Sequence, residues 1–115
     1  MEQLNRVEIR GYVGSVTLHH GPDWEMARFT VATSSAYRDR EGTAVIDTTW
    51  HNVIAWDGKG VPELRKIQKG SKIHVVGRLR NQKYMGSDGV ERTSCDILAS
   101  KANLIDSEEP LQQEM

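Results

Sequence analysis

The segment VPELRKIQ, residues 61–68, decides the fold because it is the only stretch of this chain that predicts a helix. Pro62 lies near its first turn and Gly70 lies just beyond its end, positions that these residues favour at helix termini. The predicted helix is short. The chain on either side of it has the period of a strand, so one helix interrupts an all-β protein.

Apolar and polar side chains alternate with a period of two both before and after that helix. Five strands are expected, three before the helix and two after it, over residues 7–13, 26–33, 45–56, 72–80 and 92–98. Turn-forming residues separate them at 21–23, 38–43 and 87–89. This element order predicts an OB-fold, a five-stranded Greek-key barrel with one short helix between strands 3 and 4, over residues 1–105. Other small barrels remain open on this pattern alone.

The length and composition favour one soluble cytoplasmic domain. A chain of 115 residues can fold without metal ions or disulfides. The single Cys95 has no partner within the chain, and we expect it to be a small buried group in a reducing compartment. No apolar run approaches the roughly 18 residues that a membrane span needs, and the N-terminus lacks an apolar signal segment.

The sequence offers no constellation for catalysis. It contains no Gly-rich phosphate loop, paired-carboxylate motif or nucleophile elbow. His19-His20 lies in a predicted loop with only Asp23 at ligand spacing, so a metal site is not expected. We therefore expect a protein that is not an enzyme and needs no cofactor.

The charges are segregated along the chain. Four of the 16 acidic residues lie in residues 106–115, which leaves 12 acids against 15 Lys and Arg in the first 105 residues. A mildly basic body with an acidic and disordered tail is compatible with a nucleic-acid partner but does not establish one.

Two of the three tryptophans lie in TTWHNVIAW, residues 48–56. In a strand, Trp50, Asn52, Ile54 and Trp56 share one face, and His51, Val53 and Ala55 share the other. If the second face is the core, both indole rings face water, where a nucleobase stacked on each contributes about 1–3 kcal/mol. The rings would be about 20 Å apart and would contact different nucleotides. The pattern alone also allows core or subunit-interface tryptophans.

The sequence resembles bacterial single-stranded DNA-binding proteins over nearly all of residues 5–105. The matching stretches, in order, are NRVEIRGYVG, FTVATSSAY, TWHNV and KGSKIHVVGRLR. The resemblance implies four aromatic rings that stack on DNA, at Tyr37, Trp50, Trp56 and Tyr84. It also implies that His51 supports an oligomer, with a homotetramer favoured over a dimer, and a role in replication, recombination or repair.

Tyr37 and Tyr84 each lie beside cations in a predicted hairpin, so a ring could hold a base while its neighbour neutralises a phosphate. The phosphate-binding candidates are basic residues next to these rings or in the strand and loops around them: Arg38, Arg40, Lys59, Lys69, Arg78, Arg80 and Lys83. Trp24 is expected to be structural first and a peripheral DNA contact second.

Two departures from the family leave alternatives open. The given sequence ends in EEPLQQEM rather than in a long linker with an Ile-Pro-Phe tip, so the usual recruiting tip is absent from it, and replication or repair proteins stay open as partners. Glu8 and Arg10 place charges where members often carry aliphatic side chains at a subunit contact. The alternatives are a primosomal restart-type OB protein, which is dimeric, and a protein-interaction module that covers its aromatic face with a protein partner.

Overall fold

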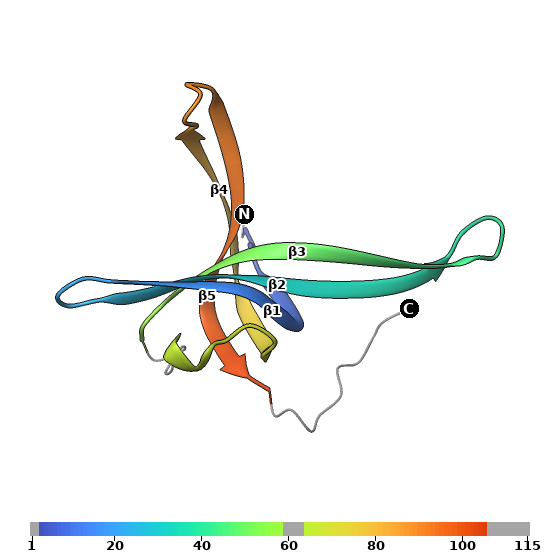
Figure 1. Ribbon diagram of the computed structural model, residues 1–115, viewed down its shortest axis with the longest axis horizontal. Helices are drawn as coiled ribbons and strands as arrows, with labels where there is room; N and C mark the ends of the chain where they lie inside the picture. The colour runs from blue at the N-terminus through green and yellow to red at the C-terminus, as the bar shows by residue number, and fades with distance from the viewer. Residues whose placement is uncertain (1–2, 59–63, 106–115) are drawn as a thin grey trace.

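The computed structural model describes residues 3–58 and 64–105, and within them five strands close into a barrel (Figure 1). Their order around the barrel is β1-β2-β3-β5-β4, with all neighbours antiparallel except β3 and β5. The strands are β1 Val7–His20, β2 Glu25–Arg38, β3 Ala44–Trp56, β4 Lys72–Met85 and β5 Glu91–Leu104. The predicted OB-fold is confirmed.

The barrel core is built from the apolar half of each alternating pattern. The largest fully buried side chains are Val31 on β2, Val53 on β3, and Ile73 and Val75 on β4. Burying one such side chain contributes roughly 1.5–3 kcal/mol, so the inward face of the strands accounts for the barrel's stability.

Two glycines allow the strands to approach each other closely. A Cβ atom at Gly11 would overlap the carbonyl oxygen of Ala32, and one at Gly77 would overlap the carbonyl oxygen of Leu98. Gly77 also lies at an irregularity in the pairing of β4 with β5. The bends that close a small barrel therefore depend on the missing side chain at these positions.

The helix prediction needs correction. Only a single 3-10 turn, η1 Leu64–Lys66, is present in the described part of residues 61–68, and residues 61–63 lie outside the described ranges. Leu64 and Ile67 are buried in the core cluster, so this turn closes the barrel. The two apolar residues need only one turn to reach the core, and Gly70, at a φ of +89°, ends the segment.

The strands extend further than their alternating patterns predicted. Pairs of strands continue beyond the barrel as two-stranded ribbons, and Figure 1 shows these projecting in different directions. In a ribbon neither face is covered, so polar residues occupy both sides and the hydrophobic alternation disappears. His19 and His20 consequently lie at the end of β1 rather than in a loop, and Tyr37 and Arg38 belong to β2.

Cys95 was expected to be buried, and that prediction is wrong: its side chain is exposed. The residue lies on β5 opposite Asn81, two positions from the buried Ile97, where the strand leaves the barrel. Residues 106–115, for which a disordered acidic tail was predicted, lie outside the described ranges. Among the described residues no helix is long and apolar enough to cross a membrane.

Candidate nucleic-acid interface

The outer face of the barrel, the side of the strands that points away from the core, carries both tryptophans of β3. Trp50 is 59% exposed and Trp56 is 52% exposed, whereas Val53 and Ala55 on the other face of the same strand are buried. The predicted orientation of the two indole rings is thus confirmed. Their role in stacking stays a prediction.

The strand register continues this outer face across the barrel. Asn52 lies opposite Thr30 on β2 and opposite Asp96 on β5, and Asp96 lies opposite Arg80 on β4. A second row joins Arg28, Ile54, Leu98 and Arg78 in the same way. Paired residues share a face of the sheet, so side chains from four strands form one surface between the two tryptophans.

Both tryptophan rings are held by neighbours. The ring of Trp50 lies against Gly14 on β1, where a Cβ atom would overlap it. Trp56 packs against Trp24, with ring centroids 5.6 Å apart and planes tilted by 58°. Such an aromatic pair contributes about 0.5–1.5 kcal/mol beyond area burial. The rings therefore face solvent without being free to collapse onto the barrel.

A groove that we call the central groove lies between β3 and the β4–β5 ribbon and has a volume of about 430 Å³. Ile54 is buried in its floor despite its outward position, and Tyr84 lies in its wall. The polar side chains that line the central groove are those of Arg28, Asn52, Gln82, Ser94 and Asp96. The structure thus places Tyr84 on the same surface as the β3 tryptophans.

A second groove, the arginine groove, has a volume of about 690 Å³ and contains Trp56, Arg78, Arg80 and Arg6. Asn5 brings the N-terminal segment to it, because its side-chain amide donates to the carbonyl oxygen of Leu79 at 2.8 Å and its oxygen accepts from the Leu79 N–H at 2.9 Å. Among the residues that the structure describes, no acidic side chain lines this groove. An indole ring beside three guanidinium groups can bind a base and its phosphates together.

The other predicted rings and cations are not gathered there. The pairing of β2 with β3 runs without a register shift, so Tyr37, opposite Val45, lies on the opposite side of its ribbon from Trp50. Lys83 lies on the opposite side of its ribbon from Tyr84 and forms an ion pair with Glu91 at 3.6 Å. Neighbours in a strand point to opposite faces, so a ring and the next cation do not form one local unit.

The remaining phosphate candidates lie on turns or at ribbon ends. Arg38 is on the Trp50 side of its ribbon and donates to the carbonyl oxygen of Gly42 at 2.8 Å. Arg40 is exposed in the turn after β2, and Lys69 is exposed in the loop before β4. Lys59 lies outside the described residues.

Three outer-face residues were missed by the sequence interpretation. Arg28 lies in the central groove, Asp96 is buried in it, and Tyr12 is half-exposed in the row that includes Trp50. The Lys72 ammonium group lies 5.9 Å from the centre of the Tyr12 ring. The alternation in residues 26–33 places Arg28 on the outer face, and this was the signal that could have identified it.

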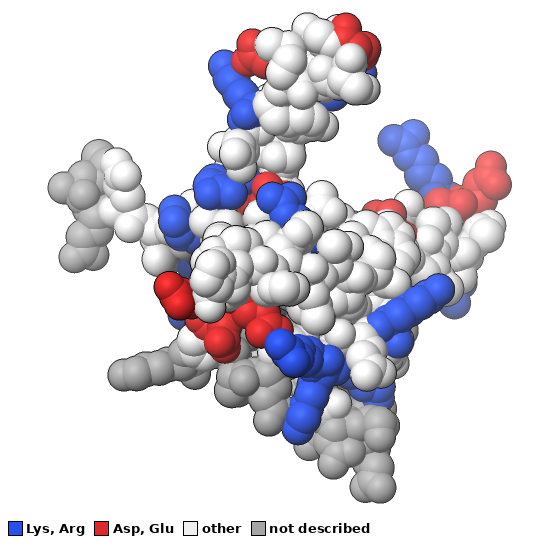
Figure 2. All heavy atoms as spheres, turned by 60° about the vertical axis from the view of Figure 1, so that its left-hand side comes forward, with Lys and Arg blue, Asp and Glu red and all other residues white. Residues whose placement is uncertain are grey.

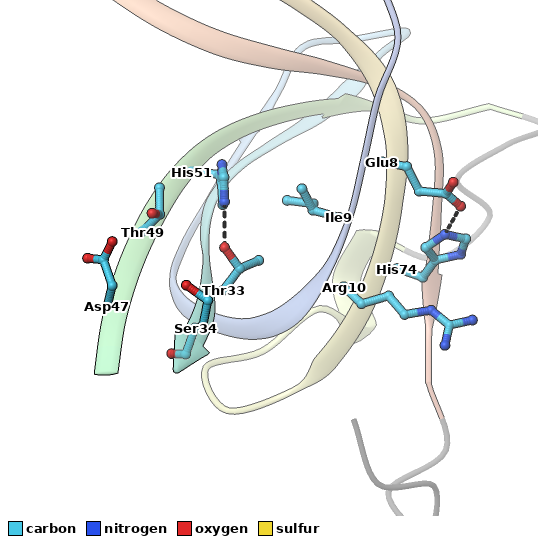
Figure 3. A pocket seen from close by; sticks show the side chains of 10 residues that line it. Glu8, Ile9, Arg10, Thr33, Ser34, Asp47, Thr49, His51 and His74 are labelled. Carbon is cyan, nitrogen blue, oxygen red and sulfur yellow. Dashed lines mark hydrogen bonds and ion pairs between the residues drawn. The ribbon is translucent and has the colours of Figure 1, made fainter. Parts of the chain in front are cut away.

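His51 lies on the inner side of β3, and its Nε2 atom forms a hydrogen bond with the hydroxyl of Thr33 at 2.8 Å. It lines a depression of about 590 Å³, across which Glu8 and His74 form a second pair at 2.6 Å (Figure 3). Partial burial lowers the pKa of His51, and the hydrogen bond from His74 lowers the pKa of Glu8. None of the described residues that line this depression also lines the central groove or the arginine groove.

On the face of the molecule shown in Figure 2, Lys and Arg side chains surround an uncharged area, and acidic side chains form a patch beside it and lie on the projecting parts as well. Among the described residues, no three His, Cys, Asp or Glu side chains are grouped so that they could hold a metal ion. The chemistry that this surface offers is aromatic stacking, cationic contact and hydrogen bonding.

A closed OB barrel with exposed rings and arginines on one face defines the general class of oligonucleotide-binding barrels. The model of the single-strand binding protein family matches residues 4–105, and the chain belongs to that family.

Named relatives agree with this assignment. The chain is 34% identical over 104 residues to the single-stranded DNA-binding protein of Neisseria meningitidis serogroup B (strain MC58), which covers 89% of this chain and 60% of the relative. It is 35% identical over 104 residues to the single-stranded DNA-binding protein of Xanthomonas campestris pv. campestris, with the same coverage. The chain therefore spans about 60% of the length of these relatives.

Two solved structures have the same fold. The Plasmodium falciparum SSB in complex with ssDNA superposes with a TM-score of 0.73 at 28% identity, over 91% of this chain and 96% of that one. A deletion mutant of the single-stranded DNA binding protein from Thermus aquaticus also superposes with a TM-score of 0.73, at 19% identity, over 91% of this chain and 52% of that one.

Proposed function

We propose that this protein binds and protects single-stranded DNA with little sequence preference and without catalysis, in replication, recombination or repair. The observation that carries the proposal is the outward position of Trp50 and Trp56 on one face with Arg28, Arg78 and Arg80 beside them. The family membership and the DNA-bound relative support it.

In this proposal the rings bind bases and the guanidinium groups bind phosphates. Trp50, Trp56 and Tyr84 stack on bases of one strand, and every base has a π-face, so stacking does not depend on base identity. Arginines of the two grooves neutralise the backbone and release counterions. Tyr37 would stack on a further base only if the DNA strand passes to the other side of the β2–β3 ribbon.

Titration with a dT oligomer tests the function directly. Stacking should quench tryptophan emission, because two of the three tryptophans are on the proposed path. The log of the binding constant should fall linearly with the log of the salt concentration, by about 0.7 per neutralised phosphate. A double-stranded oligomer of the same length is the control. Absence of quenching and of any binding at low salt would refute the proposal.

We also propose that copies of the chain associate, with a tetramer favoured over a dimer, through the surface around His51. Residues 7–11 of β1 pair only with β4, and residues 33–38 of β2 pair only with β3, so both have free edges near the His51 depression. Free edges are sites where a second chain can pair.

Sedimentation equilibrium measures the oligomer directly. The wild-type protein should be a tetramer, and His51→Lys should shift it toward smaller species, because a long charged side chain would enter the depression. Cys95→Ser, at an exposed position away from the depression, is the control. A wild-type monomer at micromolar concentration would contradict this proposal and leave DNA binding untouched.

A further inference from the structure

Asp96 is a buried carboxylate on an otherwise accessible outer face. It is 7% exposed and is the only charged residue among the buried side chains of the described chain. Within the described residues, the one hydrogen bond to its carboxylate comes from the Ser94 hydroxyl to Oδ2 at 3.3 Å, which is long for an O–H donor to a carboxylate. A buried carboxylate with so little compensation is unfavourable unless another donor reaches it.

The cations around Asp96 do not supply that donor. Arg80 lies opposite Asp96 in the strand pairing, yet its Nη2 atom donates to Oε1 of Gln82 at 3.0 Å and its buried Nε has no partner. Arg28 lines the same groove, and among the described residues no ion pair joins either arginine to Asp96. The carboxylate therefore stays an acceptor at the floor of the central groove.

The side chains beside Asp96 provide hydrogen-bond donors next to this acceptor. Because Oε1 of Gln82 accepts from Arg80, the NH₂ group of Gln82 is left to donate. Asn52, opposite Asp96 on β3, carries an amide that can donate or accept. The groove thus combines a charged acceptor with neutral donors and the guanidinium group of Arg28, and it has Tyr84 in its wall.

This combination suits the edge of a base and not a phosphate. A phosphate placed at Asp96 would meet a like charge, so we expect the phosphates at the arginines and the base edge at the carboxylate. An exocyclic amino group projects beyond the ring and can donate to the carboxylate, as in contacts of Asp or Glu with N4 of cytosine. Thymine offers instead a ring N–H recessed between two carbonyl oxygens, which the carboxylate repels.

We propose that the central groove is a base subsite in which Asp96 favours bases with an exocyclic amino group over thymine. The inference rests on the proposed binding of single-stranded DNA and adds to it a local base preference. The rings still bind any base. At one position of the bound DNA strand, Asp96 adds a preference for bases with an amino group to this otherwise base-independent stacking.

The test compares dC and dT oligomers of equal length, labelled with fluorescein, by anisotropy at low salt. Asp96→Asn should lower the ratio of dC affinity to dT affinity about fivefold to tenfold, within the range of discrimination for a direct base contact. Glu41→Gln removes one negative charge in the exposed turn between β2 and β3, outside both grooves and the His51 depression, and should leave the ratio unchanged. Circular dichroism checks that both variants fold.

A second comparison uses only the wild-type protein, so it decides the matter if Asp96→Asn fails to fold. An oligomer of 2-pyrimidinone nucleotides has the cytosine ring without its amino group, and it should bind about fivefold to tenfold more weakly than dC. Equal binding of these two oligomers would overturn the inference. So would an Asp96→Asn variant that gains affinity for dC and dT equally, which would show charge repulsion alone. If the wild type binds no oligomer, the proposed function fails and the inference fails with it.

Discussion

Replacing both Trp50 and Trp56 by alanine should weaken binding of a dT oligomer by roughly 2–6 kcal/mol, twice the contribution of a single stacked base. The two rings lie on the same face but far enough apart to contact different nucleotides, so their contributions should be nearly additive. Each single replacement should cost about half as much.

The fold should survive this double replacement because neither ring belongs to the core cluster. Labelled-oligomer anisotropy is the suitable measurement, since the variant keeps only Trp24 for intrinsic fluorescence. Val90→Ala, an exposed apolar residue at the turn of the β4–β5 ribbon, is the control for loss of apolar surface. Unchanged affinity in a folded double variant would show that the DNA does not cross this face.

Replacing Arg78 and Arg80 together by alanine should change the salt dependence of binding more than any other pair of outer-face substitutions. Both lie in the arginine groove with Trp56, and the described part of the chain places no acidic side chain in that groove. If each neutralises one phosphate, the log–log salt slope should become less steep by about 1.4. Affinity should fall most at low salt and converge with the wild type as salt rises.

The matched control removes two positive charges elsewhere. Arg65→Ala with Lys66→Ala lowers the net charge equally on η1, which closes the barrel and does not line either groove. Oligomer titrations at four or more salt concentrations measure both slopes. An equal change of slope in the two double variants would mean that net charge, and not the groove, sets the affinity.

Much of the fold and of the candidate site follows from local patterns in the sequence. The period of two predicted the strands and placed Trp50 and Trp56 on one face with Asn52, and the order of five strands and one short helix predicted the OB barrel. The pattern alone left the direction of that face open; the resemblance to single-stranded DNA-binding proteins favoured the outward one, and the burial of Val53 and Ala55 confirms it. Arg28 was predictable in the same way. Side-chain alternation is a property of one strand, so one strand's sequence records it.

Other features depend on contacts between strands distant in the sequence, and only the tertiary structure decided them. The ribbons beyond the barrel, the exposed position of Cys95 and the single turn of η1 depend on where the closed barrel ends. Because the strands extend into these ribbons, Tyr37 and Tyr84 lie on the opposite side of the chain from the cations next to them, Arg38 and Lys83. Above all, the parallel pairing of β3 with β5 brings Asp96 beside Asn52. A local pattern shows which side of a strand a residue occupies, but the neighbouring strand is chosen by closure of the whole barrel around its core.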